Sequence, residues 1–225
     1  VVRPVRKGRS PINADFNQYE DAKIDLISRI STGAFKQKQL GFYCSYCERK
    51  LPTNLAVEHI QPKKGPFGRP KLKNKWHNFL LACVNCNSVK GSKSIFFNYF
   101  FFPDRDNTFN AFSYLPDGSI RPAENISLVN KILAQNTLEL FGLDKKRRNT
   151  CDIDGNLIAE DKASQRMQIW GTAEDCLEEY QSSLGNIAVI NGIIRNMLST
   201  GFFSVWMTIF KDYPEMKNSF IDAIS

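Results

Sequence analysis

Hydrophobic positions repeat at two different spacings along the chain, and the change of spacing divides it into regions. Near the N-terminus, apolar residues recur three or four positions apart and predict a helix over residues 15–31. Between residues 42 and 95 this helical period is lost, and short apolar stretches alternate with Cys, His, Asn and Lys. The helical period returns in the C-terminal part. The helices predicted there span residues 128–143, 162–170, 173–184, 188–198 and 203–210, with a further one starting at Pro214.

Turn-forming residues complete the predicted organisation. Residues 62–75 are rich in Pro, Gly and Lys and predict a basic loop, and the Pro-Asp-Gly sequence within residues 114–121 predicts a hairpin turn. A short helix is predicted from about Asn85 to Lys93. The fold class is therefore α+β. We predict three regions: a basic arm and helix (1–40), a compact core (41–95) and a mainly helical region (96–225), which is a candidate surface for a partner.

Some segments admit a second interpretation. The aromatic run at residues 96–102 is predicted to pack in the interior, because exposed it would favour aggregation; stacking on nucleic-acid bases is the alternative. Cys151 and Cys176 have no partner at ligand spacing and are expected to be small buried residues. Residues 152–156 only partly match a calcium-binding loop, so we expect a plain turn there.

The distribution of charge along the chain is more informative than its overall composition. The 42% apolar content is ordinary for a folded protein. No stretch reaches the roughly 18 apolar residues that a membrane helix needs, and the first residues lack the pattern of a signal peptide, so we expect a cytoplasmic protein. Residues 1–100 contain 18 Lys and Arg against 6 Asp and Glu, whereas residues 101–225 contain 12 against 17. A basic N-terminal half favours a polyanionic substrate, although surface charge also serves solubility.

Four of the six cysteines form two C-x-x-C pairs, Cys44/Cys47 and Cys83/Cys86. Each pair brings two sulfurs together, and two pairs can close a tetrahedral thiolate shell. We predict Zn²⁺ as the ion, in a structural role, because a closed shell leaves no position for substrate. A redox dithiol, an iron–sulfur cluster and cysteines without metal are the alternatives.

Candidate catalytic residues lie between and just after these cysteine pairs. A neutral imidazole is a suitable general base near neutral pH, and His59 is the best candidate. Glu58 and Asn87 offer hard oxygen atoms suited to Mg²⁺ or Mn²⁺, which would stabilise the phosphate in a hydrolysis. For His77, a structural role beside Trp76 is favoured over substrate or metal binding. Basic residues that would contact phosphates, or else remain solvated charges, are Lys63, Lys64, Arg69, Lys71, Lys73, Lys75, Lys90 and Lys93.

The order C-x-x-C, E-H-I, H-N-F-L-L, C-x-x-C-N resembles the HNH, or ββα-metal, nuclease motif in its four-cysteine form. That resemblance implies a strand carrying Glu58-His59, a second strand, and a helix carrying Asn87. It implies that Asn78 hydrogen-bonds backbone and fixes the loop that presents His59. Neighbouring strand residues face opposite ways, so a bulge or the strand end would have to re-aim one member of Glu58-His59 towards the same site. The resemblance implies that it does.

Further segments of residues 3–145 resemble one family, among them R-P-V-R-K-G-R-S-P, L-A-V-E-H-I-Q-P-K, D-N-T-F-N-A-F and L-F-G-L-D. This is the PtuB family, the HNH nuclease subunit of Septu anti-phage defence, also found beside some retrons. The resemblance implies an ATPase partner, PtuA, and a DNA or RNA substrate such as tRNA. A stand-alone restriction-type HNH endonuclease and a non-catalytic zinc-dependent nucleic-acid adaptor are the alternatives. The joint presence of Glu58, His59 and Asn87 argues against the adaptor.

Overall fold

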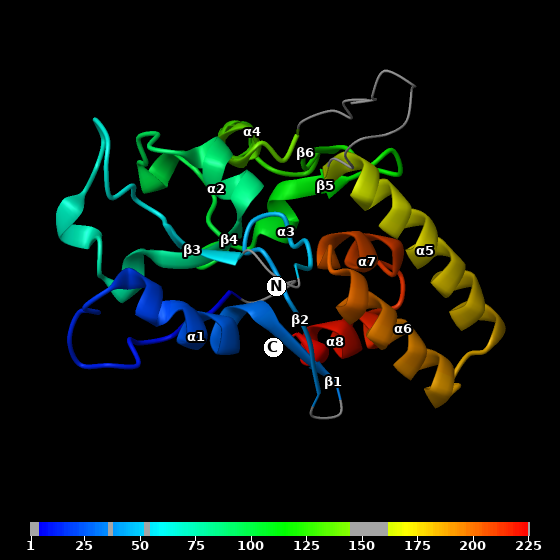
Figure 1. Cartoon of the computed structure of the whole chain (residues 1–225). Helices are drawn as coiled ribbons and strands as arrows, with labels where there is room; N and C mark the ends of the chain where they lie inside the picture. Colours follow the sequence, from blue (N-terminus) through cyan, green and yellow to red (C-terminus); the bar gives the residue numbers. More distant parts are fainter. Residues whose placement is uncertain (1–4, 36–37, 52–54, 145–161, 225) are drawn as a thin grey trace, which may run out of the picture.

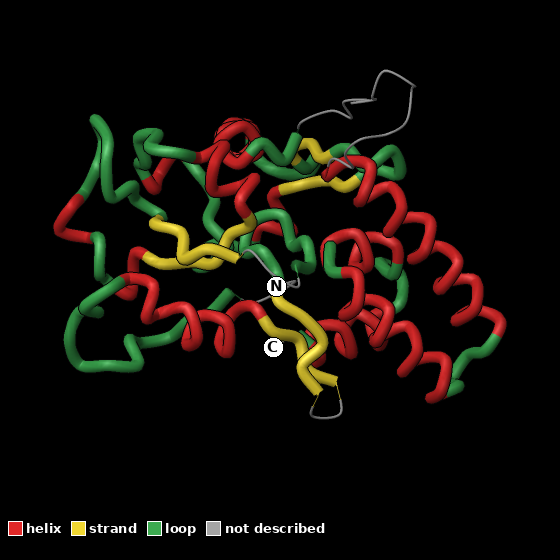
Figure 2. Tube along the Cα trace, in the orientation of Figure 1, coloured by secondary structure: helices red, strands yellow, loops and turns green. Residues whose placement is uncertain are grey.

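The computed structural model describes residues 5–35, 38–51, 55–144 and 162–224. Within these ranges it has three two-stranded antiparallel sheets, and helices make up much of the remainder (Figures 1 and 2). The predicted α+β class is confirmed. None of the described helices is long and apolar enough to cross a membrane.

A ββα unit lies at the centre of the N-terminal half (Figure 1). Strand β3 (Leu55–His59) pairs antiparallel with β4 (Phe79–Cys83), and helix α2 (Val84–Lys90) follows β4 directly. Every residue of β4 is buried, as its continuous apolar sequence F-L-L-A-C requires. The Cys83 side chain accepts a hydrogen bond from the backbone N–H of Cys86 and caps the start of α2 at Val84. The helix ends at Lys90, before Gly91, whose φ is positive.

The N-terminal helix is shorter than the sequence predicts and is not uniform. It begins at Tyr19 rather than residue 15, because Gln18 and Asp21 form a capping box that starts a 3₁₀ turn (Tyr19–Ala22). Helix α1 (Lys23–Leu26) and a π-helical turn (Ile27–Ser31) complete it.

Two of the three hairpins lie outside the ββα unit. The pair β1 (Thr32–Phe35) and β2 (Lys38–Phe42) was not predicted. Helix α3 (Thr108–Ala111) leads into β5 (Phe112–Tyr114), which pairs with β6 (Ile120–Pro122) and confirms the predicted hairpin.

The aromatic run at residues 96–102 is buried only in part. Phe102 is fully buried, whereas Phe96 and Tyr99 are 57% and 54% exposed. The prediction of interior packing is therefore wrong for these two rings. A 3₁₀ turn (Phe97–Tyr99) turns them away from the core that Phe102 enters.

The C-terminal half is helical, as predicted. Helix α5 is one continuous element where two were expected. Helix α4 ends before a left-handed Gly142, two residues short of the predicted span, and α8 starts at Pro214 as expected. Cys176 is buried on α5, as predicted, while Cys151 and residues 152–156 lie outside the described residues. The helices are α4 (Leu128–Phe141), α5 (Lys162–Ser182), α6 (Ile187–Thr200), α7 (Phe203–Ile209) and α8 (Pro214–Ala223).

Two apolar cores meet at the first cysteine turn. One core contains the ββα unit, the N-terminal helix and α4, and the other contains helices α5 to α8. The Tyr43 hydroxyl donates to the Leu198 carbonyl at 2.6 Å, and the Glu48 carboxylate accepts from the backbone and hydroxyl of Ser204 at 2.8 and 3.0 Å. The turn that holds Cys44 and Cys47 is thereby fixed to the C-terminal helices.

Candidate active site and cysteine cluster

The four paired cysteines converge, as predicted. Their sulfurs lie within 4.8 Å of one another and all four residues are buried. A tetrahedral thiolate shell with metal–sulfur bonds of about 2.3 Å places neighbouring sulfurs ~3.8 Å apart. The Sγ atoms of Cys47 and Cys83 are 3.8 Å apart. The described cysteines are free thiols, so this cluster can hold a metal ion such as zinc.

Lys162 is a buried neighbour of this cluster that the sequence analysis did not identify. Its Nζ lies 3.2 Å from the Sγ of Cys86 and donates to the carbonyl oxygens of Phe141 at 3.1 Å and Gly142 at 3.5 Å. Burial lowers the pKa of Lys162, but the sulfurs of Cys86 and Cys47 outweigh it and the net pKa is raised. Lys162 thus joins the cluster to the C-terminal, negative end of α4.

His59 is the last residue of β3 and is held by backbone and aromatic contacts. Its Nε2 is 2.8 Å from the Lys73 carbonyl oxygen, so Nε2 carries the proton and donates. Tyr19 and Phe79 pack edge-on against the ring, with centroids 4.7 and 5.3 Å away. Among the described residues, Nδ1 has no hydrogen-bond partner, so its lone pair is available to accept a proton.

The surroundings of His59 keep its imidazole neutral. Burial lowers its pKa to about 4; the hydrogen bond to Lys73 opposes the shift, and the nearby charges of Lys63 and Lys90 add to it. A histidine in this environment is a neutral base at physiological pH.

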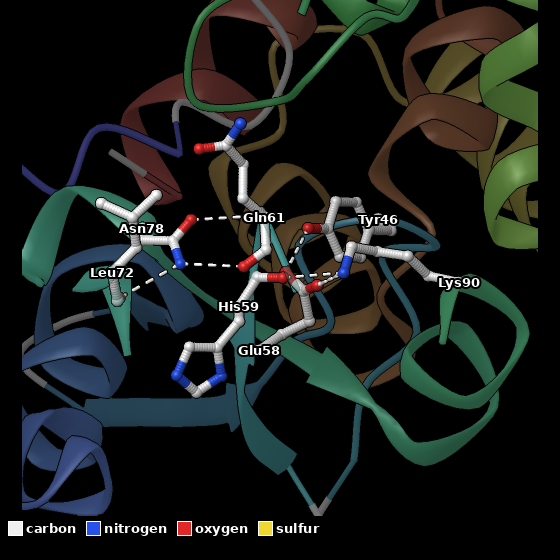
Figure 3. Close-up of polar contacts among 7 residues, drawn as sticks. All are labelled: Tyr46, Glu58, His59, Gln61, Leu72, Asn78 and Lys90. Carbon is white, nitrogen blue, oxygen red and sulfur yellow. Dashed lines mark hydrogen bonds and ion pairs between the residues drawn. The ribbon is translucent and has the colours of Figure 1, made fainter. Parts of the chain in front are cut away.

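Glu58 points away from His59, across β3 (Figure 3). Its Oε1 pairs with the Nζ of Lys90 at 2.6 Å, and its Oε2 accepts from the Tyr46 hydroxyl at 2.5 Å. The expected re-aiming does not occur, because β3 and β4 pair without a bulge from Leu55 to His59. A cation that used this carboxylate would compete for it with the Lys90 ammonium. The metal role of Glu58 stays a prediction.

Asn78 fixes the basic loop to β4, as expected (Figure 3). Its side-chain oxygen accepts from the backbone N–H of Gln61 at 2.8 Å. Its amide nitrogen donates to the carbonyls of Gln61 at 3.0 Å and Leu72 at 3.3 Å. These bonds hold both ends of the loop that delivers the Lys73 carbonyl to His59, so Asn78 helps to position the His59 ring.

His59 and Asn87 line the same open cleft of about 540 Å³, which we call the His59 cleft. Lys63 and Lys64 also line it, and the Lys63 ammonium lies 3.4 Å from the centre of the Tyr19 ring. His77 is exposed and does not line this cleft.

The predicted phosphate-binding lysines do not all face solvent. Lys71, Lys73 and Lys93 are exposed. The prediction that Lys90 contacts phosphate is wrong, because this residue is only 1% exposed. Its ammonium pairs with Glu58 and donates to the His59 carbonyl oxygen at 2.7 Å.

Comparison with known proteins agrees with this geometry. A family model described as HNH endonuclease matches residues 44–93, from the first cysteine of the cluster to just beyond α2. These residues therefore form an HNH endonuclease domain, and the protein is a metal-dependent nuclease that hydrolyses phosphodiester bonds.

A relative extends the likeness beyond this domain. A protein of Vibrio cholerae serotype O1 biovar El Tor, named "Retron Vc95 putative HNH endonuclease", is 29% identical over 147 residues. The match covers 62% of this chain and 68% of that protein.

Proposed function

We propose that the protein is the nuclease of a bacterial anti-phage defence complex and that His59 is its general base. The observation that carries the catalytic part is the fixed tautomer of His59: Nε2 donates to Lys73 at 2.8 Å, which leaves Nδ1 to take a proton from water in the His59 cleft. A positioned base of this kind typically contributes about 10²–10⁴-fold to the rate.

The remaining residues of the site have supporting roles in this proposal. Lys63 and Lys64 bind the substrate phosphates, and Asn78 keeps the loop in place. Asn87 offers an amide oxygen to a Mg²⁺ or Mn²⁺ ion, which when bound would stabilise charge on the phosphate and leaving oxygen. The four-cysteine cluster holds Zn²⁺ in a structural role, which the 3.8 Å sulfur spacing supports.

The defence role and the ATPase partner, PtuA, follow from the sequence resemblance to the PtuB family. The name of the Vibrio cholerae relative, which refers to a retron, supports this context. Helix α4 offers a surface for the partner: Leu128, Val129 and Ile132 are 75%, 64% and 53% exposed. Large apolar side chains exposed together are typical of protein–protein contacts.

The proposal is tested with the purified protein and the ATPase encoded next to it. Each is incubated alone and together with labelled DNA and total RNA in the presence of Mg²⁺, and complex formation is followed by size exclusion. We expect a single complex and cleavage that depends on the ATPase. A Leu128→Asp/Ile132→Asp variant should elute apart from the ATPase, whereas Leu184→Asp, which alters an exposed apolar residue elsewhere, should not.

Cleavage that is equally fast without the ATPase, together with separate elution, would instead identify a stand-alone endonuclease. If no condition gives cleavage, the remaining interpretation is the non-catalytic nucleic-acid adaptor.

A further inference from the structure

Three large aromatic side chains are exposed beside the His59 cleft. Phe67 lies at the tip of the basic loop, and Phe96 and Tyr99 lie on the segment after α2; each is more than half exposed. The rings of Phe96 and Tyr99 form an edge-to-face pair with centroids 6.1 Å apart. Other aromatics of the same segment do enter the interior, Phe102 completely. The exposure of these rings is thus specific to their positions and not a property of the whole segment.

Two further hollows lie next to the His59 cleft and are lined in part by these rings. The first, of about 220 Å³, shares Pro62 with the His59 cleft and is lined by Phe67, Arg69 and Phe96. The second, of about 600 Å³, shares Phe96 with the first and is lined by Tyr99 and Lys93. Each hollow thus shares lining residues with the next, and we call the series of three, from the His59 cleft to the aromatic pair, the track.

The charges along this track favour a polyanion. Lys63 and Lys64 line the His59 cleft, Arg69 lines the first hollow and Lys93 the second. The first hollow has no carboxylate among its lining residues. The two acidic side chains on the track lie at its ends, Glu20 in the cleft and Glu139 in the second hollow, where Glu139 accepts a hydrogen bond from Gln135.

We propose that this track binds an unpaired stretch of nucleic acid, whose bases stack on Phe67, Phe96 and Tyr99 while its phosphates meet Lys64, Arg69 and Lys93. The inference builds on the proposed nuclease function and specifies its substrate as single-stranded next to the cut. Exposed aromatic rings stack on the flat faces of bases. In a duplex those faces are covered by the neighbouring base pairs, whereas in a single strand they are accessible. Alternation of aromatic rings and cations is typical of surfaces that follow a single strand without reading its sequence.

The experiment measures binding separately from cleavage. Fluorescence anisotropy of the full-length protein, with no Mg²⁺ or Mn²⁺ added, compares a labelled 12-nucleotide oligo(dT) and oligo(U) with a 12-base-pair DNA duplex. We expect tighter binding of the single strands. Phe96→Ala/Tyr99→Ala should weaken single-strand binding about fivefold or more for each ring removed. The matched control, Leu184→Ala/Ile187→Ala, removes exposed apolar side chains elsewhere and should bind like the wild type.

The salt dependence distinguishes the two kinds of contact. Arg69→Ala and Lys93→Ala should each reduce the slope of log K against log salt by about 0.7, while the aromatic variant keeps the slope of the wild type. Equal affinity for duplex and single strand would overturn the proposal. The proposal would also be overturned if the aromatic variant bound single strands as tightly as the wild type. If that variant instead lost its association with the ATPase, this surface would be a protein-docking site. If the protein binds single strands as expected but cleaves no nucleic acid, the nuclease function is refuted while the proposed binding role of the track stands.

Discussion

The Glu58–Lys90 ion pair allows a quantitative test of how the site is held together. Both side chains are almost fully buried, at 0% and 2% exposure, and the charged atoms are 2.6 Å apart. Glu58→Gln keeps an oxygen for the Tyr46 hydroxyl but leaves the Lys90 ammonium without a counter-charge. Leaving one charge of a buried pair unmatched destabilises a protein by about 3–5 kcal/mol. For a chain of this size, that corresponds to a melting temperature lower by roughly 6–20 °C.

The assay is a double-mutant cycle on the metal-loaded protein, followed by urea and thermal unfolding. Glu58→Gln and Lys90→Met should each destabilise strongly, and the double variant should regain a coupling energy of about 2–3 kcal/mol, because no unmatched charge remains. Glu124→Gln is the matched control: it breaks an ion pair of 2.7 Å with Arg121 whose side chains are exposed, and should change stability by less than about 1 kcal/mol.

If the destabilisations of the two single variants simply add, with a coupling energy below about 0.5 kcal/mol, Glu58 and Lys90 do not interact as a buried ion pair. A stable double variant also reports on the metal. If that variant keeps its fold and cleaves like the wild type, Glu58 acts in the ion pair alone and not as a metal ligand.

Three further predictions concern the cysteine cluster and its support. Cys44→Ser, or removal of the metal with a chelator, should unfold the ββα unit, as circular dichroism would show; native stability without metal would contradict a structural ion. Lys162→Met should speed metal loss to a chromogenic chelator by about tenfold, because its ammonium lies 3.2 Å from the Cys86 sulfur; an unchanged rate would exclude that role. Gly118→Ala should lower the urea midpoint, since a Cβ there would lie 1.9 Å from the Ala163 carbonyl oxygen and φ is +75°; an unchanged midpoint would contradict that close approach.

The sequence is most informative where structure depends on local spacing. The convergence of the C-x-x-C pairs and the helix that starts at Pro214 each follow from residues close together in the chain, and these predictions are confirmed. The division of this segment into two helices, at 162–170 and 173–184, was wrong, because α5 continues through Gly171. A Cβ at Gly171 would meet nothing within 4 Å, so this exposed glycine weakens the helix by only about 1 kcal/mol and does not end it.

The contacts that define the site join residues far apart in sequence and leave no local signal. Lys90 reaches the His59 carbonyl across 31 residues, and Lys162 reaches Cys86 across 76. Nothing in a single sequence distinguishes these buried lysines from solvated ones, which is why Lys90 was assigned to phosphate. Lys73 orients the His59 ring through its backbone carbonyl oxygen. Any residue at that position has this group, so the sequence gives no sign of the contact.

The most direct test of the nuclease mechanism uses the two histidines of the chain as a matched pair. His59 lies in the cleft, whereas His77 is exposed and outside it. Cleavage rates of the wild type, His59→Ala and His77→Ala are compared under conditions where the wild type is active, with fold and metal content checked for each. The account predicts that His59→Ala loses about 10²–10⁴-fold in rate while His77→Ala stays within a few fold of wild type. A folded His59→Ala protein that cuts within about threefold of wild type, well short of the loss expected of a general base, would contradict it.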